Sequence, residues 1–296
     1  MATADTLTLA RRDRRFGYWL TAPGLAALML VITFPLIFAF FTSFYDYTLL
    51  TPNHDNFIGL ENYQEALDEE YLPGSMWVTA KFVLASVVIE FIIGFSVALA
   101  LNTINRFKTV YYLILLAPLL INPVVVGLLW RMLLHSELGI VNYVIGLVGI
   151  GPVNWLGDAT NAFWTVVLVD IWHQVSFMAI LLLAGLSALP REPYEAARMD
   201  GASPIRCFFH ITLPLMRPVI IVALLLRLIF AIKTFDIIFI MTKGGPGTAT
   251  DLISYFIYRA AFFGLDIGRA SAMSVGLLVI VLALTTYLYR YMRSLR

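Results

Sequence analysis

The chain has 296 residues, of which 60% are hydrophobic and 13% are charged, and its mean hydropathy is +0.84. Soluble domains are roughly half apolar and a quarter charged, so this composition excludes an ordinary soluble protein and indicates an integral membrane protein. The net charge of +1 gives no support to nucleic-acid binding, and the single cysteine, Cys207, excludes an internal disulfide and a multi-cysteine metal site.

The first 17 residues form a basic tail that carries Arg11, Arg12, Arg14 and Arg15. The uncharged run that follows superficially resembles a secretion signal. It is too long for the apolar region of such a signal, and no small-residue cleavage site follows it. We therefore expect a retained first span, with residues 1–17 as a cytoplasmic tail and residues 18–296 as one six-span membrane domain.

Six apolar stretches, each long enough for a helix that crosses a bilayer, follow one another along the chain. Only helices or closed barrels satisfy the backbone in lipid, and these stretches lack the alternation of barrel strands, so the predicted fold is all-α. Pro118 and Pro123 predict a kink in the third stretch. The predicted spans are residues 18–41, 78–101, 110–134, 163–188, 218–241 and 270–289.

Lysine and arginine are distributed unevenly between the predicted loops, which indicates the orientation of the chain. With the N-terminus inside, the opposite side receives only Lys243, Arg259 and Arg269 in its loops. Both termini and the loop between the fourth and fifth spans are therefore expected in the cytoplasm. The bases on that side are Arg11, Arg12, Arg14, Arg15, Arg106, Lys108, Arg191, Arg198, Arg206, Arg217, Arg290, Arg293 and Arg296.

The polar segment 190–217 lies between two apolar spans and is predicted to form a hairpin of two short helices. Gly201 can adopt the left-handed conformation that ends a helix, and Ser203, followed by a proline, is typical of a cap at the start of the next one. Pro214 and Pro218 are expected to close the second helix and to start the fifth span.

Within this hairpin, the sequence EAARMDGASPIRCFFHITLPLMRP strongly resembles the EAA motif of permease subunits in binding-protein-dependent ABC importers. The stretches FIGLENYQEAL, IKTFDIIFIMTKGGPGTATDLISYFIYRAAFF and IGRASAMS resemble the sugar-importer branch, so the resemblance extends from Phe57 to Ser274. The residues that match the motif are Glu195, Ala196, Ala197, Asp200, Gly201, Ala202, Phe209, Leu213 and Pro214.

The resemblance implies the six-helix fold of an ABC type I importer permease, in which the hairpin is a coupling helix. Glu195 would pair with a basic residue of an ATPase subunit, and Gly201 would set the angle between the two short helices. The implied function is half of the alternating-access pathway of an ATP-driven importer for a sugar, polyol or related small carbohydrate. The chain would then be no enzyme and would lie in a bacterial inner membrane.

The same resemblance implies the partners of the chain. They are a second homologous permease, two ATPase subunits and an extracytoplasmic solute-binding protein, alongside membrane lipid and the carbohydrate substrate. No cofactor is expected in this chain, because it lacks a G-x-x-x-x-G-K-[ST] phosphate loop, and ATP and Mg would bind to the ATPase subunits. His173 has no second ligand at a suitable spacing for a metal ion.

Polar side chains on one face of the fourth span and one stripe of the fifth indicate a substrate pathway. In maltose-type permeases, which this sequence resembles, the sugar contacts come from these two segments. The chain departs from them at Asp170 and Arg227, where amides and hydroxyls are usual, so an internal ion pair between these two residues is an equal alternative. The predicted pathway residues are Asp170, His173, Gln174, Phe177, Arg227, Ala231 and Thr234.

Two further features follow the fifth span. Lys233 and Asp236 are three residues apart and are interpreted as a structural pair on one helix face. Gly244, Gly245 and Pro246 resemble the external loop that meets the binding protein in the family, although a plain turn is the alternative.

Two other classes of function remain open at this point. An ion-gradient-driven secondary transporter of a small polar solute would agree with the polar face around Asp170 and His173, but the sequence shows no clear similarity between its halves. An intramembrane enzyme would need a nucleophile–base or metal motif, and the sequence shows none.

Overall fold

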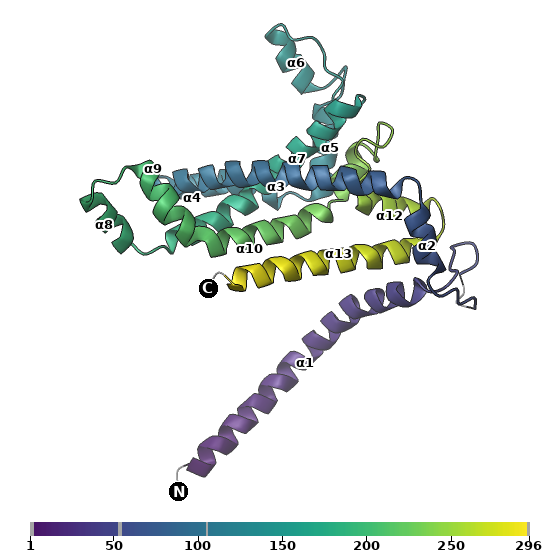
Figure 1. Ribbon diagram of the computed structural model, residues 1–296, viewed down its shortest axis with the longest axis horizontal. Coiled ribbons are helices and arrows are strands. Elements are labelled where there is room, and N and C mark those ends of the chain that lie inside the picture. The colour runs from purple at the N-terminus through teal and green to yellow at the C-terminus, as the bar shows by residue number, and fades with distance from the viewer. Residues whose placement is uncertain (1–2, 53–54, 105, 295–296) are drawn as a thin grey trace. The chain divides into compact units, whose positions relative to one another are not determined.

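The computed structural model describes residues 3–52, 55–104 and 106–294, and the regular elements in these ranges are all helices (Figure 1). Two isolated β-bridges, Tyr45 with Phe57 and Thr48 with Asp266, are the extended pairings within these ranges. The helices are α1 Thr3–Thr42, α2 Glu61–Asp68, α3 Leu72–Thr103, α4 Lys108–Leu120, α5 Pro123–Leu133, α6 Ile140–Leu147, α7 Ala159–Ser187, α8 Glu192–Met199, α9 Pro204–Cys207, the π-helix η1 Phe208–Thr212, α10 Leu213–Ile232, α11 Asp236–Met241, α12 Ile253–Phe262 and α13 Ile267–Ser294.

Within the described residues, five helical segments are long and apolar enough to cross a membrane, and the bent pair of α4 and α5 would make a sixth. The five are Tyr18–Thr42, Leu72–Thr103, Ala159–Ser187, Pro204–Met241 and Ile267–Tyr291. The chain is thus an all-α membrane protein, and a helix lies at each of the six predicted stretches.

The chain divides into two compact units, which are described separately. One contains Met1–Asp68 and Ala260–Leu277, and the other contains Glu69–Arg259 and Leu278–Arg296. In the smaller unit, the side chain of Asn62 is buried and donates to the carbonyls of Ser43 and Tyr45, at 3.0 and 2.9 Å. This asparagine fixes the turn that follows α1.

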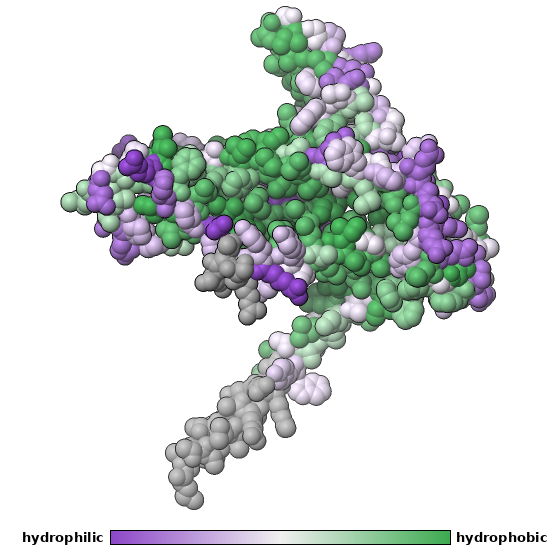
Figure 2. Space-filling model, in the orientation of Figure 1, coloured by the Kyte–Doolittle hydropathy of each residue, from purple (hydrophilic) through white to green (hydrophobic). Residues whose placement is uncertain are grey.

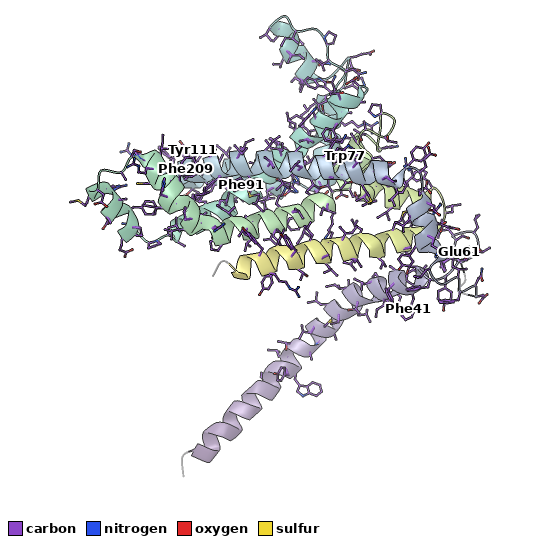
Figure 3. All side chains as sticks on the ribbon, in the orientation of Figure 1. Phe41, Glu61, Trp77, Phe91, Tyr111 and Phe209 are labelled. Atoms are coloured by element: carbon purple, nitrogen blue, oxygen red, sulfur yellow. The ribbon has the colours of Figure 1, made fainter. Side chains whose placement is uncertain are left out.

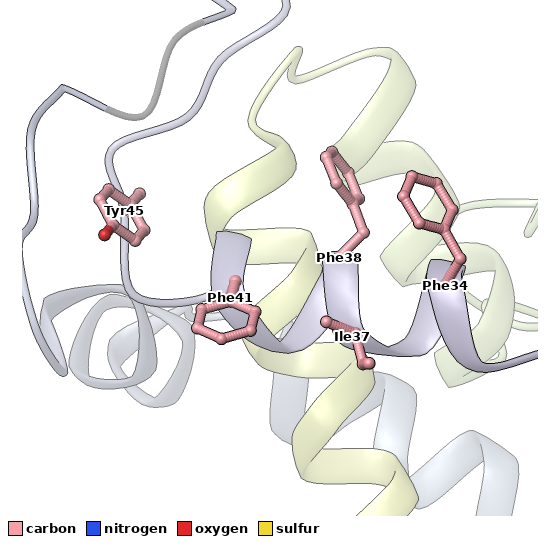
Figure 4. A pocket seen from close by; sticks show the side chains of 5 residues that line it. All are labelled: Phe34, Ile37, Phe38, Phe41 and Tyr45. Atoms are coloured by element: carbon pink, nitrogen blue, oxygen red, sulfur yellow. The ribbon is translucent and has the colours of Figure 1, made fainter.

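The span at the end of α1 is largely exposed within this chain from Tyr18 to Phe41, although it is almost entirely apolar. Its aromatic side chains surround a shallow apolar pocket, shown in Figure 4, to which the turn contributes Tyr45. Such a surface belongs in lipid or against another membrane helix, because the contact of apolar side chains with water is unfavourable. The pocket is lined by Phe34, Ile37, Phe38, Phe41 and Tyr45.

The larger unit is organised around α3, α7 and α10, which lie side by side (Figure 1). Glycines allow the close approach of these helices. A Cβ atom at Gly94 of α3 would lie 2.8 Å from the Met178 side chain of α7, and one at Gly185 of α7 would lie 2.7 Å from Val219 of α10. Small residues at such crossings let membrane helices pack by van der Waals contact, which is the main force between them in lipid.

The third predicted span is broken more sharply than a proline kink would require. The axes of α4 and α5 differ by 93°. Ile121 and Asn122 have extended backbone between the two helices, and Asn122 caps α5 by accepting a hydrogen bond from the Val124 amide at 2.9 Å. The predicted kink is therefore present, but residues 110–134 do not form one continuous helix.

The fifth predicted span also differs from the expectation. Pro214 and Pro218 do not separate the hairpin from the span, because the backbone is helical without interruption from Pro204 to Ile232. The π-helix η1 lies directly before Pro214, and Pro218 lies inside α10. The break lies instead at residues 233–235, before α11.

Candidate functional site

Three charged side chains meet in the interior of the larger unit, one from each of its central helices. Arg227 of α10 donates to both oxygens of Glu90 on α3, with the Nη2–Oε1 distance at 2.8 Å, and also to Oδ2 of Asp170 on α7. The exposed fractions of Glu90, Asp170 and Arg227 are 0%, 2% and 1%. We call these three residues the buried ion cluster.

The cluster stabilises the arrangement of the three helices. An arginine can form paired hydrogen bonds with a carboxylate, and here Nη2, which belongs to that pair, also donates to a second carboxylate. Charged residues cost about 2.5–3.5 kcal/mol at the centre of a membrane helix, so they are usually paired with one another. The internal ion pair between Asp170 and Arg227, which the sequence offered as an alternative, is present in the structure.

Glu90 is the member of the cluster that the sequence did not assign. It is separated from Arg227 by 137 positions, so no local spacing indicates the pair. The available signal was the carboxylate itself, because a glutamate within an apolar span requires a partner.

His173 supports the break between α4 and α5. Its Nε2 lies 3.1 Å from the carbonyl oxygen of Ile121, and its Nδ1 lies 3.1 Å from Nε2 of Gln174. Since a carbonyl can only accept, Nε2 donates to Ile121 and Nδ1 accepts from the Gln174 amide. Ser176 adds a hydrogen bond to the carbonyl of Leu115, and α7 thus holds the broken helix in place.

The remaining predicted pathway residues lie where α7 meets α10. Phe177 packs edge-to-face against Phe230, with ring centroids 5.5 Å apart. Ala231 is fully buried, and Thr234 follows the end of α10, where its carbonyl accepts from Ser254 at 2.5 Å. The structure joins Asp170 and Arg227 directly, whereas Gln174 contacts His173, Phe177 contacts Phe230 and Thr234 contacts Ser254. Their assignment to a substrate pathway stays a prediction.

The predicted pairing of Lys233 and Asp236 on one helix face is wrong. Lys233 follows the last residue of α10, whereas Asp236 is the first residue of α11, so no single helix carries both. No ion pair joins them among the described residues. The prediction assumed that both residues lie on one continuous helix, and the helix is broken between them.

The polar hairpin has the local structure that its sequence predicts. It consists of α8 and α9, and Gly201 between them has φ +72°. The Ala202 amide donates to the Ala197 carbonyl at 2.9 Å, and Ser203 caps α9 through the Arg206 amide at 3.4 Å. Figure 1 shows the hairpin at one end of the larger unit, beyond the ends of α3, α7 and α10.

The hairpin is attached firmly to the helix that follows it. The hydroxyl of Tyr194 on α8 donates to the hydroxyl of Thr212 in η1 at 2.9 Å. Because α9, η1 and α10 follow one another without a break, the second helix of the hairpin and the helix that carries Arg227 form one continuous element.

The hairpin presents an unusual combination of exposed side chains. Met199, Ile205 and Phe209 are 88%, 71% and 58% exposed, and Figure 3 places Phe209 at the hairpin end of the unit, with Trp77 at the opposite end of α3. Glu195 is exposed, and its carboxylate pairs with no other residue that the structure describes. Of the other motif residues, Ala196, Asp200, Gly201 and Pro214 are exposed, and Ala197, Ala202 and Leu213 are half-buried.

At the other end of the unit, residues 243–251 form a loop that is fixed by its own hydrogen bonds. Gly244 has φ +80°, and the hydroxyl of Thr250 donates to the Gly245 carbonyl at 2.8 Å. Asp251 is fully buried and accepts from Arg259 at 2.7 Å and from Ser75 of α3 at 3.3 Å. Burial raises the pKa of the Asp251 carboxyl above its ordinary value, although Arg259 opposes this effect.

The described residues contain no group of three or more His, Cys, Asp or Glu side chains that could hold a metal ion. The larger unit instead presents a helical body with an exposed hairpin at one end and a hydrogen-bonded loop at the other.

Comparison with known proteins agrees with this arrangement. Residues 90–295 match the family model described as binding-protein-dependent transport system inner membrane component. The trehalose/maltose transport system permease protein MalF of Thermococcus litoralis is 39% identical over 280 residues, which cover 95% of this chain and 94% of that protein. The sulfoquinovosyl glycerol transport system permease protein SmoG of Agrobacterium fabrum is 36% identical over 282 residues, which cover 95% and 92%.

A solved structure shows the same fold. A bacterial ABC transporter that imports the acidic polysaccharide alginate contains a chain that superimposes with a TM-score of 0.84 at 22% sequence identity. The match covers 98% of this chain and 99% of that chain.

Proposed function

This chain belongs to the family of binding-protein-dependent transport system inner membrane components. From this membership we propose the class of its substrate, its partners and the route by which ATP hydrolysis acts on it. Members of the family are permease subunits of ABC importers, which are transport components and not enzymes. The chain is accordingly a membrane permease of an ATP-driven importer. The alternative of an ion-gradient-driven transporter finds no support in the family.

The proposed substrate is a sugar, polyol or related small carbohydrate. The observation that carries this proposal is the 39% identity to a trehalose/maltose permease over nearly the whole of both chains. A relative at 36% identity transports a sulfoquinovosyl glycerol, a different carbohydrate derivative, so the proposal extends to the class and not to one sugar.

The proposed path runs along the facing surfaces of α7 and α10. Gln174, Phe177 and Thr234 are half-buried and are proposed to contact the substrate. Asp170, His173, Arg227 and Ala231 lie deeper and are proposed to act by holding those three in position. An uncharged sugar would then be received by amide, hydroxyl and aromatic groups, in keeping with its own chemistry.

The hairpin is the proposed point at which ATP hydrolysis acts on this chain. Its exposed apolar side chains would fill a cleft of an ATPase subunit, and the Glu195 carboxylate would pair with a base there. A displacement of α8 would pass through the Tyr194–Thr212 hydrogen bond and the continuous helix to Arg227. The buried ion cluster would convey it to α3 and α7, so that these helices tilt together.

The proposed assembly pairs this chain with a second homologous permease, two ATPase subunits that bind ATP and Mg, and a solute-binding protein. We propose that both termini and the hairpin face the cytoplasm, because the basic loop residues gather on that side. The loop around Gly244, Gly245 and Pro246 would then lie outside and contact the binding protein. Residues 1–17 are proposed as a cytoplasmic tail to a single six-span domain of residues 18–296.

Uptake by the assembled transporter tests this function. The complex would be reconstituted in proteoliposomes with its binding protein, and radiolabelled trehalose and maltose would be offered with and without ATP. We expect uptake of a carbohydrate that requires ATP and the binding protein and that persists when ionophores collapse ion gradients. Uptake that follows the ion gradient and ignores ATP would refute the proposal.

A further inference from the structure

The break between α10 and α11 frees a backbone carbonyl within a span. α10 ends at Ile232 and α11 begins at Asp236, and both helices belong to the apolar segment Pro204–Met241. In an unbroken helix the Thr234 carbonyl would accept a hydrogen bond from the amide of Ile238. No backbone amide in the described part of the chain donates to this carbonyl.

The surroundings make a donor from another element necessary. Figure 2 shows hydrophobic residues over the middle of the larger unit, where its apolar spans lie. In such surroundings a backbone carbonyl costs free energy unless a donor satisfies it.

A serine from a different helix satisfies the Thr234 carbonyl. The hydroxyl of Ser254 donates to its oxygen at 2.5 Å, although the two residues are 20 positions apart in the chain. Ser254 lies in the first turn of α12, and the residue before it is fixed to α3, because the Ile253 amide donates to the Thr79 hydroxyl at 2.8 Å. The donor therefore comes from a helix whose start is itself held in place.

Aromatic contacts hold the break at the next residue. The ring centroid of Phe235 lies 5.1 Å from that of Tyr258 and 6.3 Å from that of Tyr255, and both tyrosines belong to α12. Tyr255 is buried, so this contact lies in the interior of the unit. The backbone at Thr234 and Phe235 is thus fixed by α12, through one hydrogen bond and through ring packing.

The side chain of Thr234 is left available to bind a ligand. Within the described residues its hydroxyl makes one long hydrogen bond, 3.4 Å to the Phe230 carbonyl. The buried ion cluster fixes α10 at Arg227, about two turns earlier. The direction of the Thr234 hydroxyl therefore follows from a backbone that the cluster holds on one side and Ser254 on the other.

We propose that Ser254 is a positioning residue of the substrate pathway, which rests on the transport function and the role of Thr234 proposed above. By binding the Thr234 carbonyl, Ser254 fixes the peptide group there and sets the direction in which the Thr234 hydroxyl meets a carbohydrate. A small number of well-placed polar groups orients a ligand in such a site, so a rotation of this peptide would weaken the contact. Ser254 uses its single donor within the chain and acts on the substrate only through Thr234.

Uptake measured together with ATP hydrolysis tests this role. The transporter in proteoliposomes would receive its binding protein with radiolabelled trehalose or maltose, and the quantity compared is the carbohydrate imported per ATP hydrolysed. Ser254→Ala should lower this ratio by about fivefold, which is the size of effect expected from the loss of one hydrogen bond. Ser254→Thr keeps the hydroxyl and should restore most of the ratio.

Ser86→Ala is the matched control. The Ser86 hydroxyl is also buried and also donates to a backbone carbonyl, that of Phe82 at 2.8 Å, but it does so within the continuous helix α3. The helix itself supplies an amide to that carbonyl, so the substitution frees no acceptor and should leave the ratio unchanged. An equal fall in Ser86→Ala and Ser254→Ala would overturn the proposal.

A double substitution separates positioning from simple stabilisation of the fold. If Ser254 acts through Thr234, Thr234→Ala should lower the ratio as far as Ser254→Ala does, and the double variant should lose nothing more. Losses that multiply in the double variant, or an unaltered ratio in either single variant, would overturn the proposal. Thr234→Ala alone decides the matter if Ser254→Ala does not assemble. The transport function fails separately, if the unmodified complex imports no carbohydrate with ATP.

Discussion

Arg227 on α10 binds Glu90 on α3 through two hydrogen bonds, and both side chains are removed from solvent. Asp170 on α7 binds the same guanidinium, so one cation joins three helices. This arrangement lies on the helix that begins at the coupling hairpin, and it provides a physical link between the hairpin and the rest of the bundle.

The first prediction concerns the free energy of the buried ion cluster. Arg227→Met leaves two buried carboxylates without their cation, and such a loss costs about 3–5 kcal/mol. We expect a clear fall in the thermal unfolding midpoint of the detergent-solubilised complex, which fluorescence-detected size-exclusion chromatography would measure. Lys233→Met, an exposed lysine just beyond the same helix, is the control and should change the midpoint little.

The same prediction has a compensating variant. Glu90→Gln and Asp170→Asn remove the two negative charges, so adding them to Arg227→Met should restore much of the lost stability. If the triple variant is no more stable than Arg227→Met alone, the loss does not come from uncompensated charge.

The second prediction concerns Glu195 at the coupling hairpin. Glu195→Ala should leave insertion and folding intact, because the carboxylate is exposed and unpaired within the described chain. It should lower substrate-stimulated ATPase activity and uptake by tenfold or more, about 1.4 kcal/mol or above, if the pair with the ATPase subunit is lost. Glu192→Ala, an exposed glutamate one turn earlier, is the matched control, and an equal effect of both substitutions would argue against a specific role for Glu195.

The third prediction concerns the turn between α8 and α9. Gly201 has φ +72°, and a β-branched residue resists this conformation, whereas asparagine tolerates it. Nothing lies within 4 Å of a Cβ atom built at this position, so backbone strain and not steric collision should decide the result. Gly201→Val should impair uptake and Gly201→Asn should retain most of it. Equal activity of the two variants would show that the turn geometry has no part in coupling.

The fourth prediction concerns Asp251 in the loop after α11. Burial raises its pKa from the ordinary 3.8, so folding of the loop shifts this carboxyl toward its neutral form relative to the unfolded chain. Its contribution to loop stability is therefore fully present below that ordinary pKa and is lost as pH rises through the elevated one. Arg259 and Ser75 are the groups that face it, and both favour the ionised form without reversing the shift.

Hydrogen exchange of residues 243–259, corrected for the intrinsic pH dependence of exchange, would measure this effect. Protection in the unmodified protein should fall as pH rises through the acidic range, and Asp251→Asn should abolish that fall because the amide does not ionise. Protection that increases with pH would contradict the stated direction.

Much of the fold could be predicted from the sequence because its signals are local. Apolar length located the helices, and Gly201 and Ser203 fixed the hairpin turn through rules that involve only neighbouring residues. The continuous helix through Pro214 could not be predicted in this way, because proline usually ends a helix and no local rule indicated the π-turn before it. Pro118 and Pro123 indicated where the third span bends, but they did not indicate that the angle between α4 and α5 is 93°.

The interior contacts were harder to predict because they join residues far apart in the chain. Asp170 and Arg227 were recognised as possible partners, but Glu90 lies on a third helix whose packing no spacing indicates. The role of His173 also depends on distant structure, since its partner is a carbonyl freed by the break at Ile121.

Cross-linking of the hairpin in the purified transporter tests the central claim most directly. Ile205, which is 71% exposed and outside the matched motif positions, would be replaced by cysteine in a Cys207→Ser chain, with Leu138→Cys, 87% exposed in the segment between α5 and α6, as the control. The account predicts that a short bifunctional reagent joins position 205, and not position 138, to an ATPase subunit. A purified, transport-active complex in which position 205 cross-links to no ATPase subunit would contradict it.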